Sequence, residues 1–126
     1  MPVRYVIDKD RRLVLTIGEG SVTFDDIKHH QDRLLSDPAF DAKFDQLIDV
    51  TTATSFLLSA EEAKEIARRP IVSPTSRRAF VASKPAVYGM GRLMRVYHER
   101  NAQVDVFYDR DSALKWLGIE QDSGLF

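Results

Sequence analysis

The chain of 126 residues contains no cysteine, which excludes disulfides, thiolate nucleophiles and cysteine-ligated metal. It also lacks an excess of either charge: 18 lysines and arginines oppose 19 aspartates and glutamates, a formal net charge of -1. Such a chain has no overall electrostatic field that would draw it to nucleic acid or anionic lipid. We therefore expect no nucleic-acid partner and no thiol chemistry.

Long apolar runs are absent too, and a membrane-spanning helix needs about 20 such residues. Residues 1–5 show no basic-then-apolar signal segment. The hydrophobic fraction of 44% and the charged fraction of 29% are ordinary for a globular protein. We expect a cytoplasmic protein with one domain over residues 1–120 and a short tail over residues 121–126.

Strand patterns begin at the N-terminus. Apolar residues alternate at period two over residues 3–7 and 13–17, on either side of a charged turn, which predicts an antiparallel hairpin. The run from Ala79 to Ala82 is continuously apolar, as is typical of a central parallel strand covered on both faces. Beyond the hairpin, the predicted strands cover residues 44–50, 77–83 and 104–108.

Helix signals alternate with these strands. Thr23 stands at an N-cap position before apolar residues at helical spacing, and Ser59 forms a capping box with Glu62. Pro85 suits the first turn of a third helix, and Asp109 caps a fourth. The predicted helices cover residues 24–35, 59–69, 85–100 and 110–117.

The resulting order is β-β-α-β-α-β-α-β-α. It predicts an α/β fold with a mixed sheet of about five strands and about four helices, in which an antiparallel hairpin precedes parallel strands with right-handed connections.

The end of the chain contains the pattern F-x-D-x-x-x-A-x-x-W-L, from Phe107 to Leu117. With the element order, this pattern resembles the SpoIIAA-like family, relatives of the STAS anti-sigma-factor-antagonist domains. The resemblance covers nearly the whole chain and implies a non-enzymatic regulatory or ligand-binding module.

In the regulatory STAS domains, a strand ending in aspartate leads to an Asp-Ser pair, whose serine is phosphorylated at the start of a helix. Here Asp49 resembles the strand end, but Leu57 and Leu58 stand at the expected Asp-Ser positions. Only Ser59 remains at the helix start. The resemblance therefore implies the scaffold more than the phosphorylation switch, and the alternative role of Ser59 is simply to cap the helix with Glu62.

The preferred candidate site is a loop predicted over residues 51–58. It follows the carboxyl end of a parallel strand, the edge where open α/β sheets bind ligands. Its hydroxyls could orient a polar group, and its apolar residues could line a cleft or contact a partner. Alternatively, the apolar residues pack under the sheet and the hydroxyls make local turn bonds. The candidate residues are Asp49, Thr51, Thr52, Thr54, Ser55, Phe56, Leu58 and Ser59.

A second candidate lies at the next strand end. Ser83 and Lys84 precede Pro85 and a helix N-terminus, and Arg92 follows two turns later, so an anion could bind there. The alternative is that the amides are those of any strand-helix junction.

Two further groups favour structural roles. His29 and His30 lie near aspartates, but adjacent helical residues point in different directions, which favours a solvated face over a metal site. Four arginines at positions 68, 69, 77 and 78 could form a local basic patch, and we expect them to be solvated or paired with acids. We expect no metal and no cofactor.

The leading hypothesis is a regulatory or ligand-binding module that binds a protein partner or small ligand at the strand carboxyl ends. One alternative is a small hydrolase or transferase with Asp49 or a histidine as base. Another is a carrier of a lipid or apolar ligand, since relatives of the family resemble Sec14-type lipid-binding domains. The carrier requires a cavity beneath residues 56–58. Pairing of strand edges or apolar helix faces could also produce a homodimer.

Overall fold

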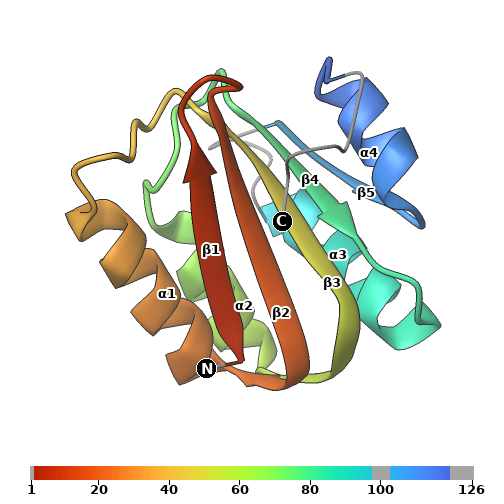
Figure 1. Cartoon of the computed structure of the whole chain (residues 1–126). Helices are drawn as coiled ribbons and strands as arrows, with labels where there is room; N and C mark the ends of the chain where they lie inside the picture. The colour runs from red at the N-terminus through yellow and green to blue at the C-terminus, as the bar shows by residue number, and fades with distance from the viewer. Residues whose placement is uncertain (1, 98–102, 120–126) are drawn as a thin grey trace.

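A computed structural model of the chain describes residues 2–97 and 103–119 and confirms the predicted element order (Figure 1). Predictions that fall on residues 98–102 and 120–126, including the end of the third helix and the tail, lie outside the described residues. The strands are β1 (Val3–Asp8), β2 (Leu13–Thr23), β3 (Asp45–Leu57), β4 (Arg77–Val81) and β5 (Gln103–Phe107). The helices are α1 (Phe24–Ser36), α2 (Ala60–Arg68), α3 (Pro85–Tyr97) and α4 (Arg110–Trp116).

The five strands form one mixed sheet in the order β1-β2-β3-β4-β5. The β1 and β2 strands are antiparallel, and every later neighbour is parallel, as predicted. The β4 strand lies inside the sheet, between β3 and β5: Ala79 and Val81 pack beneath α4, while Phe80 packs on the opposite face. The prediction of a strand covered on both sides is therefore confirmed.

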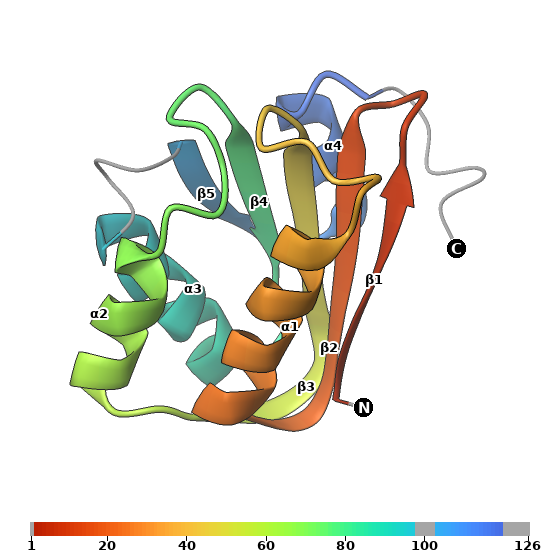
Figure 2. The same cartoon turned by 90° about the vertical axis from the view of Figure 1, so that its left-hand side faces the viewer.

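The helices lie in two layers (Figure 2). The α1, α2 and α3 helices, which connect successive parallel strands, cover one face of the sheet. The α4 helix lies on the other face, where Leu114 and Leu117 pack on Leu13 and Leu15. The apolar contacts of α4 in β2 and β3 are with residues near the start of each strand, so α4 leaves the carboxyl-terminal parts of these strands uncovered on that face (Figure 1).

The predicted helix starts are confirmed. Thr23 and Ser59 each complete a capping box, in which the hydroxyl accepts a backbone N–H three residues later and that residue's carboxylate accepts the cap N–H. The Asp109 side chain caps α4 by accepting from the Ser112 amide. These bonds satisfy helix N–H groups that would otherwise have no partner.

The predicted loop over residues 51–58 is wrong in its conformation. Residues 51–57 continue β3 and pair with an extension of β2 that reaches Thr23. Two register shifts near Gly18 and Gly20 make this possible: Gly20 has a φ of +62°, and a Cβ on Gly18 would lie 3.1 Å from Val50. The β-branched threonines suit the extended backbone.

Candidate functional site

Asp49 lies in the middle of the long strand β3, on the face of the sheet that bears α4. One carboxylate oxygen accepts the Thr51 amide at 3.0 Å and the Thr51 hydroxyl at 2.7 Å. The other oxygen lies 2.6 Å from Nη2 of Arg110, in the first turn of α4. Burial acts to raise the Asp49 pKa, but the bonds from Thr51 and Arg110 outweigh it and hold the pKa below its usual value.

The strand-helix junction after β4 joins this cluster through the Thr51 carbonyl. The Lys84 ammonium donates to that oxygen at 3.0 Å, and the Ser83 hydroxyl donates to it at 3.4 Å. The structure therefore brings parts of the two predicted sites together, and it adds Arg110, which sequence reasoning did not select. Arg92 lies exposed on α3.

The remaining hydroxyls make bonds typical of structural roles. Thr52 donates to the Gly18 carbonyl at 3.3 Å, and the Ser55 hydroxyl lies 3.1 Å from that of Ser21. Thr54 is exposed, and Ser59 is the exposed cap of α2. These side chains therefore fit the alternative in which the hydroxyls make local hydrogen bonds better than the alternative in which they orient a polar group of a ligand.

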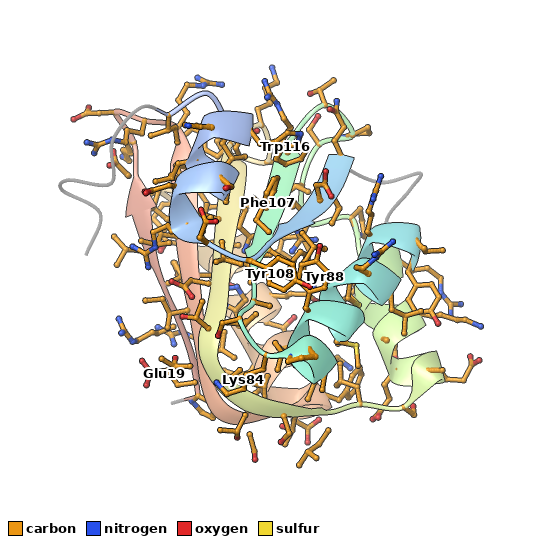
Figure 3. All side chains as sticks on the ribbon, turned by 90° about the vertical axis from the view of Figure 1, so that its right-hand side faces the viewer. Glu19, Lys84, Tyr88, Phe107, Tyr108 and Trp116 are labelled. Carbon is orange, nitrogen blue, oxygen red and sulfur yellow. The ribbon has the colours of Figure 1, made fainter. Side chains whose placement is uncertain are left out.

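A stacked aromatic pair, of which Tyr108 is exposed and Tyr88 is half-buried, lies at the carboxyl end of β5. The rings of Tyr88 and Tyr108 are stacked, 4.1 Å between centroids and 2° from parallel, and Tyr108 is 61% exposed. Figure 3 shows the two rings side by side, and Lys84 lies below them in this view.

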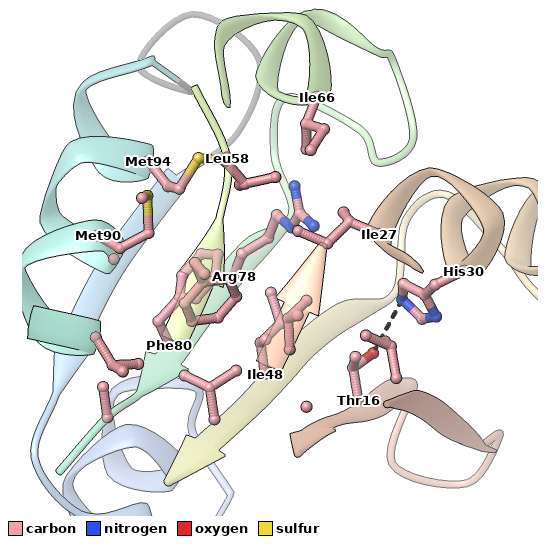
Figure 4. Close-up of a pocket in the computed structure, with 18 of the residues that line it drawn as sticks. Thr16, Ile27, His30, Ile48, Leu58, Ile66, Arg78, Phe80, Met90 and Met94 are labelled. Atoms are coloured by element: carbon pink, nitrogen blue, oxygen red, sulfur yellow. Dashed lines mark hydrogen bonds between the residues drawn. The ribbon is translucent and has the colours of Figure 1, made fainter. Parts of the chain in front are cut away.

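Phe56 and Leu58 point away from this surface, into the layer between the sheet and α1, α2 and α3. There they line a cavity of about 80 Å³ (Figure 4). None of the described residues that line the cavity is exposed. Most are apolar, and the two methionines, Met90 and Met94, lie on α3. A single water needs about 10–15 Å³ of such space, so the cavity has room for several non-hydrogen atoms.

One side of the cavity is polar. Arg78, on the helix-facing side of β4, donates from Nε to the Gln46 side-chain oxygen at 2.9 Å. The Gln46 amide nitrogen donates to the Thr16 hydroxyl at 2.9 Å, and that hydroxyl lies 3.4 Å from Nε2 of His30. The four side chains thus connect β4, β3, β2 and α1 across the cavity wall.

Two predictions of solvated residues are wrong here. Arg78 and His30 are 7% and 6% exposed. Burial lowers the Arg78 pKa to about 10, so the guanidinium remains charged at neutral pH. Burial, together with the positive charges of Arg78 and Arg33, lowers the His30 pKa to about 4, so the imidazole is neutral. The Nδ1 atom of His30 is buried without a hydrogen-bond partner.

The other arginines of the predicted basic patch also have partners. Arg69 donates to Asp32 and to the Gln31 side chain, and Arg77 donates to the Trp116 carbonyl. The expectation that these arginines form ion pairs is met by Arg69. Arg69 and Arg77 therefore contact other parts of the chain instead of forming a solvated basic patch.

Two general features hold for residues 2–97 and 103–119. No described helix is long and apolar enough to cross a membrane. The described histidines and carboxylates form no group of three or more that could hold a metal ion.

The order of the elements and the five-stranded mixed sheet with helices on both faces define an α/β fold. A solved structure from Shewanella loihica PV-4, of an uncharacterized protein from the DUF3478 family with a SpoIIAA-like fold, is similar to this chain with a TM-score of 0.64. The match covers 91% of this chain and 93% of that one at 17% identity. The predicted resemblance is thereby confirmed for the fold. Neither a family model nor a curated protein matches the sequence.

Proposed function

We propose that the chain is a non-enzymatic ligand-binding module whose small, largely apolar ligand occupies the cavity between the sheet and α1, α2 and α3. The observation that supports this most is the cavity itself: about 80 Å³ of space lined by buried apolar side chains and reached by both Phe56 and Leu58. Protein interiors are packed with few voids larger than a water molecule, so such a space suggests an occupant.

The lining favours binding over chemistry. Flexible methionine side chains such as Met90 and Met94 adapt to ligands of different shape. His30 is a weak base at neutral pH because its pKa is about 4. Asp49 does not line the cavity and is paired with Arg110. Asp49 and the buried His30 therefore lack the environment of a general base.

The test is a titration of the protein with 1-pentanol, in which the methyl resonances of Met90 and Met94 are monitored by NMR. We expect saturable shifts of both resonances. The cavity-filling substitution Val87→Phe is the matched variant, because Val87 is buried on α3 and lines the same space. It should abolish the shifts while the fold is retained. Unsaturable shifts, or equal shifts in the variant, would contradict the proposal.

A second candidate function is binding of a protein partner at the carboxyl end of the sheet. The exposed Tyr108 ring, which stacks on the half-buried Tyr88, supports it, because aromatic residues are enriched where proteins bind one another. A second copy of the chain is the simplest partner to test. Light scattering of the wild type and Tyr108→Ser tests this. A dimer that is lost in the variant would support binding of a second copy at this surface, and a monomeric wild type would rule out the homodimer.

A further inference from the structure

The polar side chains in the wall of the cavity are hydrogen-bonded to other side chains of the protein. Gln46 accepts from Nε of Arg78 at 2.9 Å and donates to the Thr16 hydroxyl at 2.9 Å. That hydroxyl also lies 3.4 Å from Nε2 of His30 (Figure 4). Arg78 has an interaction besides its bond to Gln46, so its guanidinium is not free. These four side chains therefore have partners in the protein without a ligand.

The rest of the wall offers a ligand no polar contact. Gln31, the fifth polar side chain among the described lining residues, is 2% exposed and accepts from Nη1 of Arg69 at 2.9 Å. The Nδ1 atom of His30 has no hydrogen-bond partner, but it is covered by protein atoms and so does not face the open space. The other described residues that line the cavity are apolar or glycine. A ligand there meets almost only hydrocarbon and thioether groups.

From these contacts we infer that the ligand of the cavity is a small uncharged hydrocarbon, a molecule with no hydrogen-bonding group at all. This inference rests on the proposed function and names the chemical class of the ligand. The specificity comes from a wall whose polar groups bond to one another, so that only apolar surface remains for the ligand.

Hydration and size favour a hydrocarbon over other small molecules. A hydroxyl that leaves water without gaining a hydrogen bond binds less tightly than a methyl group in the same place. A site built for an alcohol would instead hold a polar group that stays unpaired until the ligand binds. An ionised head group loses still more hydration on burial. A space of about 80 Å³ has room for roughly five to eight non-hydrogen atoms.

The test compares two probes of equal size on the full chain: pentane and 1-butanol. The alcohol has a hydroxyl where the alkane has a methyl group, so the two have the same number of non-hydrogen atoms. The methyl resonances of Met90 and Met94, which line the cavity, report the binding of each probe by NMR. We expect pentane to bind roughly tenfold more tightly, or better.

The variant Val50→Thr supplies the free polar group that the wall lacks. Val50 is 5% exposed and lines the cavity from β3, and threonine adds a hydroxyl that can both donate and accept. We expect the preference for pentane to fall by about threefold or more, because this hydroxyl can pair with that of 1-butanol. Val14→Thr is the matched control: Val14 is 1% exposed but does not line the cavity, so the preference should be unchanged.

The results that would overturn the inference are distinct from those that would overturn the proposed function. Equal affinity for the two probes, or a preference for 1-butanol, would refute the hydrocarbon while leaving a ligand-binding cavity in place. An unchanged preference in Val50→Thr would also contradict it, since the polarity of the wall would then not set the specificity. Binding of neither probe, nor of 1-pentanol, would refute the proposed function as well. If a buried substitution unfolds the chain, the comparison of the two probes on the wild type alone decides.

Discussion

The carboxylate of Asp49 lies 2.6 Å from a guanidinium nitrogen of Arg110, which ties the middle of β3 to the first turn of α4. The two side chains are 13% and 22% exposed, so the pair is largely shielded from water. The two bonds from Thr51 and the charged Arg110 together outweigh the effect of burial and hold the Asp49 pKa below its usual value.

Removing that partner should therefore cost stability. We expect Arg110→Met to lower the free energy of unfolding by about 2 kcal/mol, as is common for hydrogen bonds to charged groups, and to raise the Asp49 pKa. The matched control is Arg4→Met, which removes an ion pair with Glu19 whose side chains are about half exposed. It should cost less than about 1 kcal/mol. Denaturant unfolding measures both, and equal losses would contradict this account.

His30 should make the stability depend on pH. Its pKa is about 4 in the folded chain and 6.5 when unperturbed, so the unfolded state binds the proton more tightly. The contribution of neutral His30 is then complete above pH 6.5 and is lost as the pH falls toward 4. A shift of this size corresponds to roughly 3 kcal/mol.

Unfolding curves between pH 7.5 and 4 test this, with two histidine variants. His30→Gln should flatten the loss of stability over that range, and His29→Gln, on the exposed side of α1, should retain it. The same slope in His30→Gln as in the wild type would show that another group causes the pH dependence.

Cavity filling should be tolerated only where the cavity is. We expect Val87→Phe to change the unfolding free energy by less than about 1 kcal/mol, because the larger ring enters existing space. Val14→Phe is the matched control: Val14 is 1% exposed in the same layer but does not line the cavity. It should lose about 1–3 kcal/mol through overpacking. A comparable loss in both variants would argue that the cavity is closed in solution.

Ser59 should behave as a helix cap. Ser59→Ala removes the acceptor for the Glu62 amide and should cost about 1 kcal/mol, whereas Ser59→Asp keeps an acceptor and should stay near the wild type. Neither change should alter the binding of 1-pentanol. Loss of binding in the aspartate variant would instead point to control of the cavity by charge at this position.

Sequence patterns predicted the element order because local signals agreed with the tertiary structure. The caps at Thr23, Ser59 and Asp109 and the alternating apolar residues of the hairpin each predict the observed elements. The extension of β3 was missed because its partner is remote: residues 51–57 become a strand only by pairing with the end of β2, past Gly18 and Gly20.

The polar wall of the cavity contained signals that could have been used. Arg77 and Arg78 are adjacent in a strand covered on both faces. Because successive side chains of a strand point to opposite faces, one of the two must point toward α1, α2 and α3. His30 is three residues after Ile27 and four before Leu34, on the buried stripe of α1. The volume left between the layers depends on how all the side chains pack, and no local pattern encodes it.

A crystal structure of the protein pressurised with xenon tests the central claim most directly. Xenon enters apolar cavities and is located by its anomalous scattering. The account predicts a peak between the sheet and α3, close to Ile48 and Met90. A cavity filled by side chains, with no xenon in that layer, would contradict it.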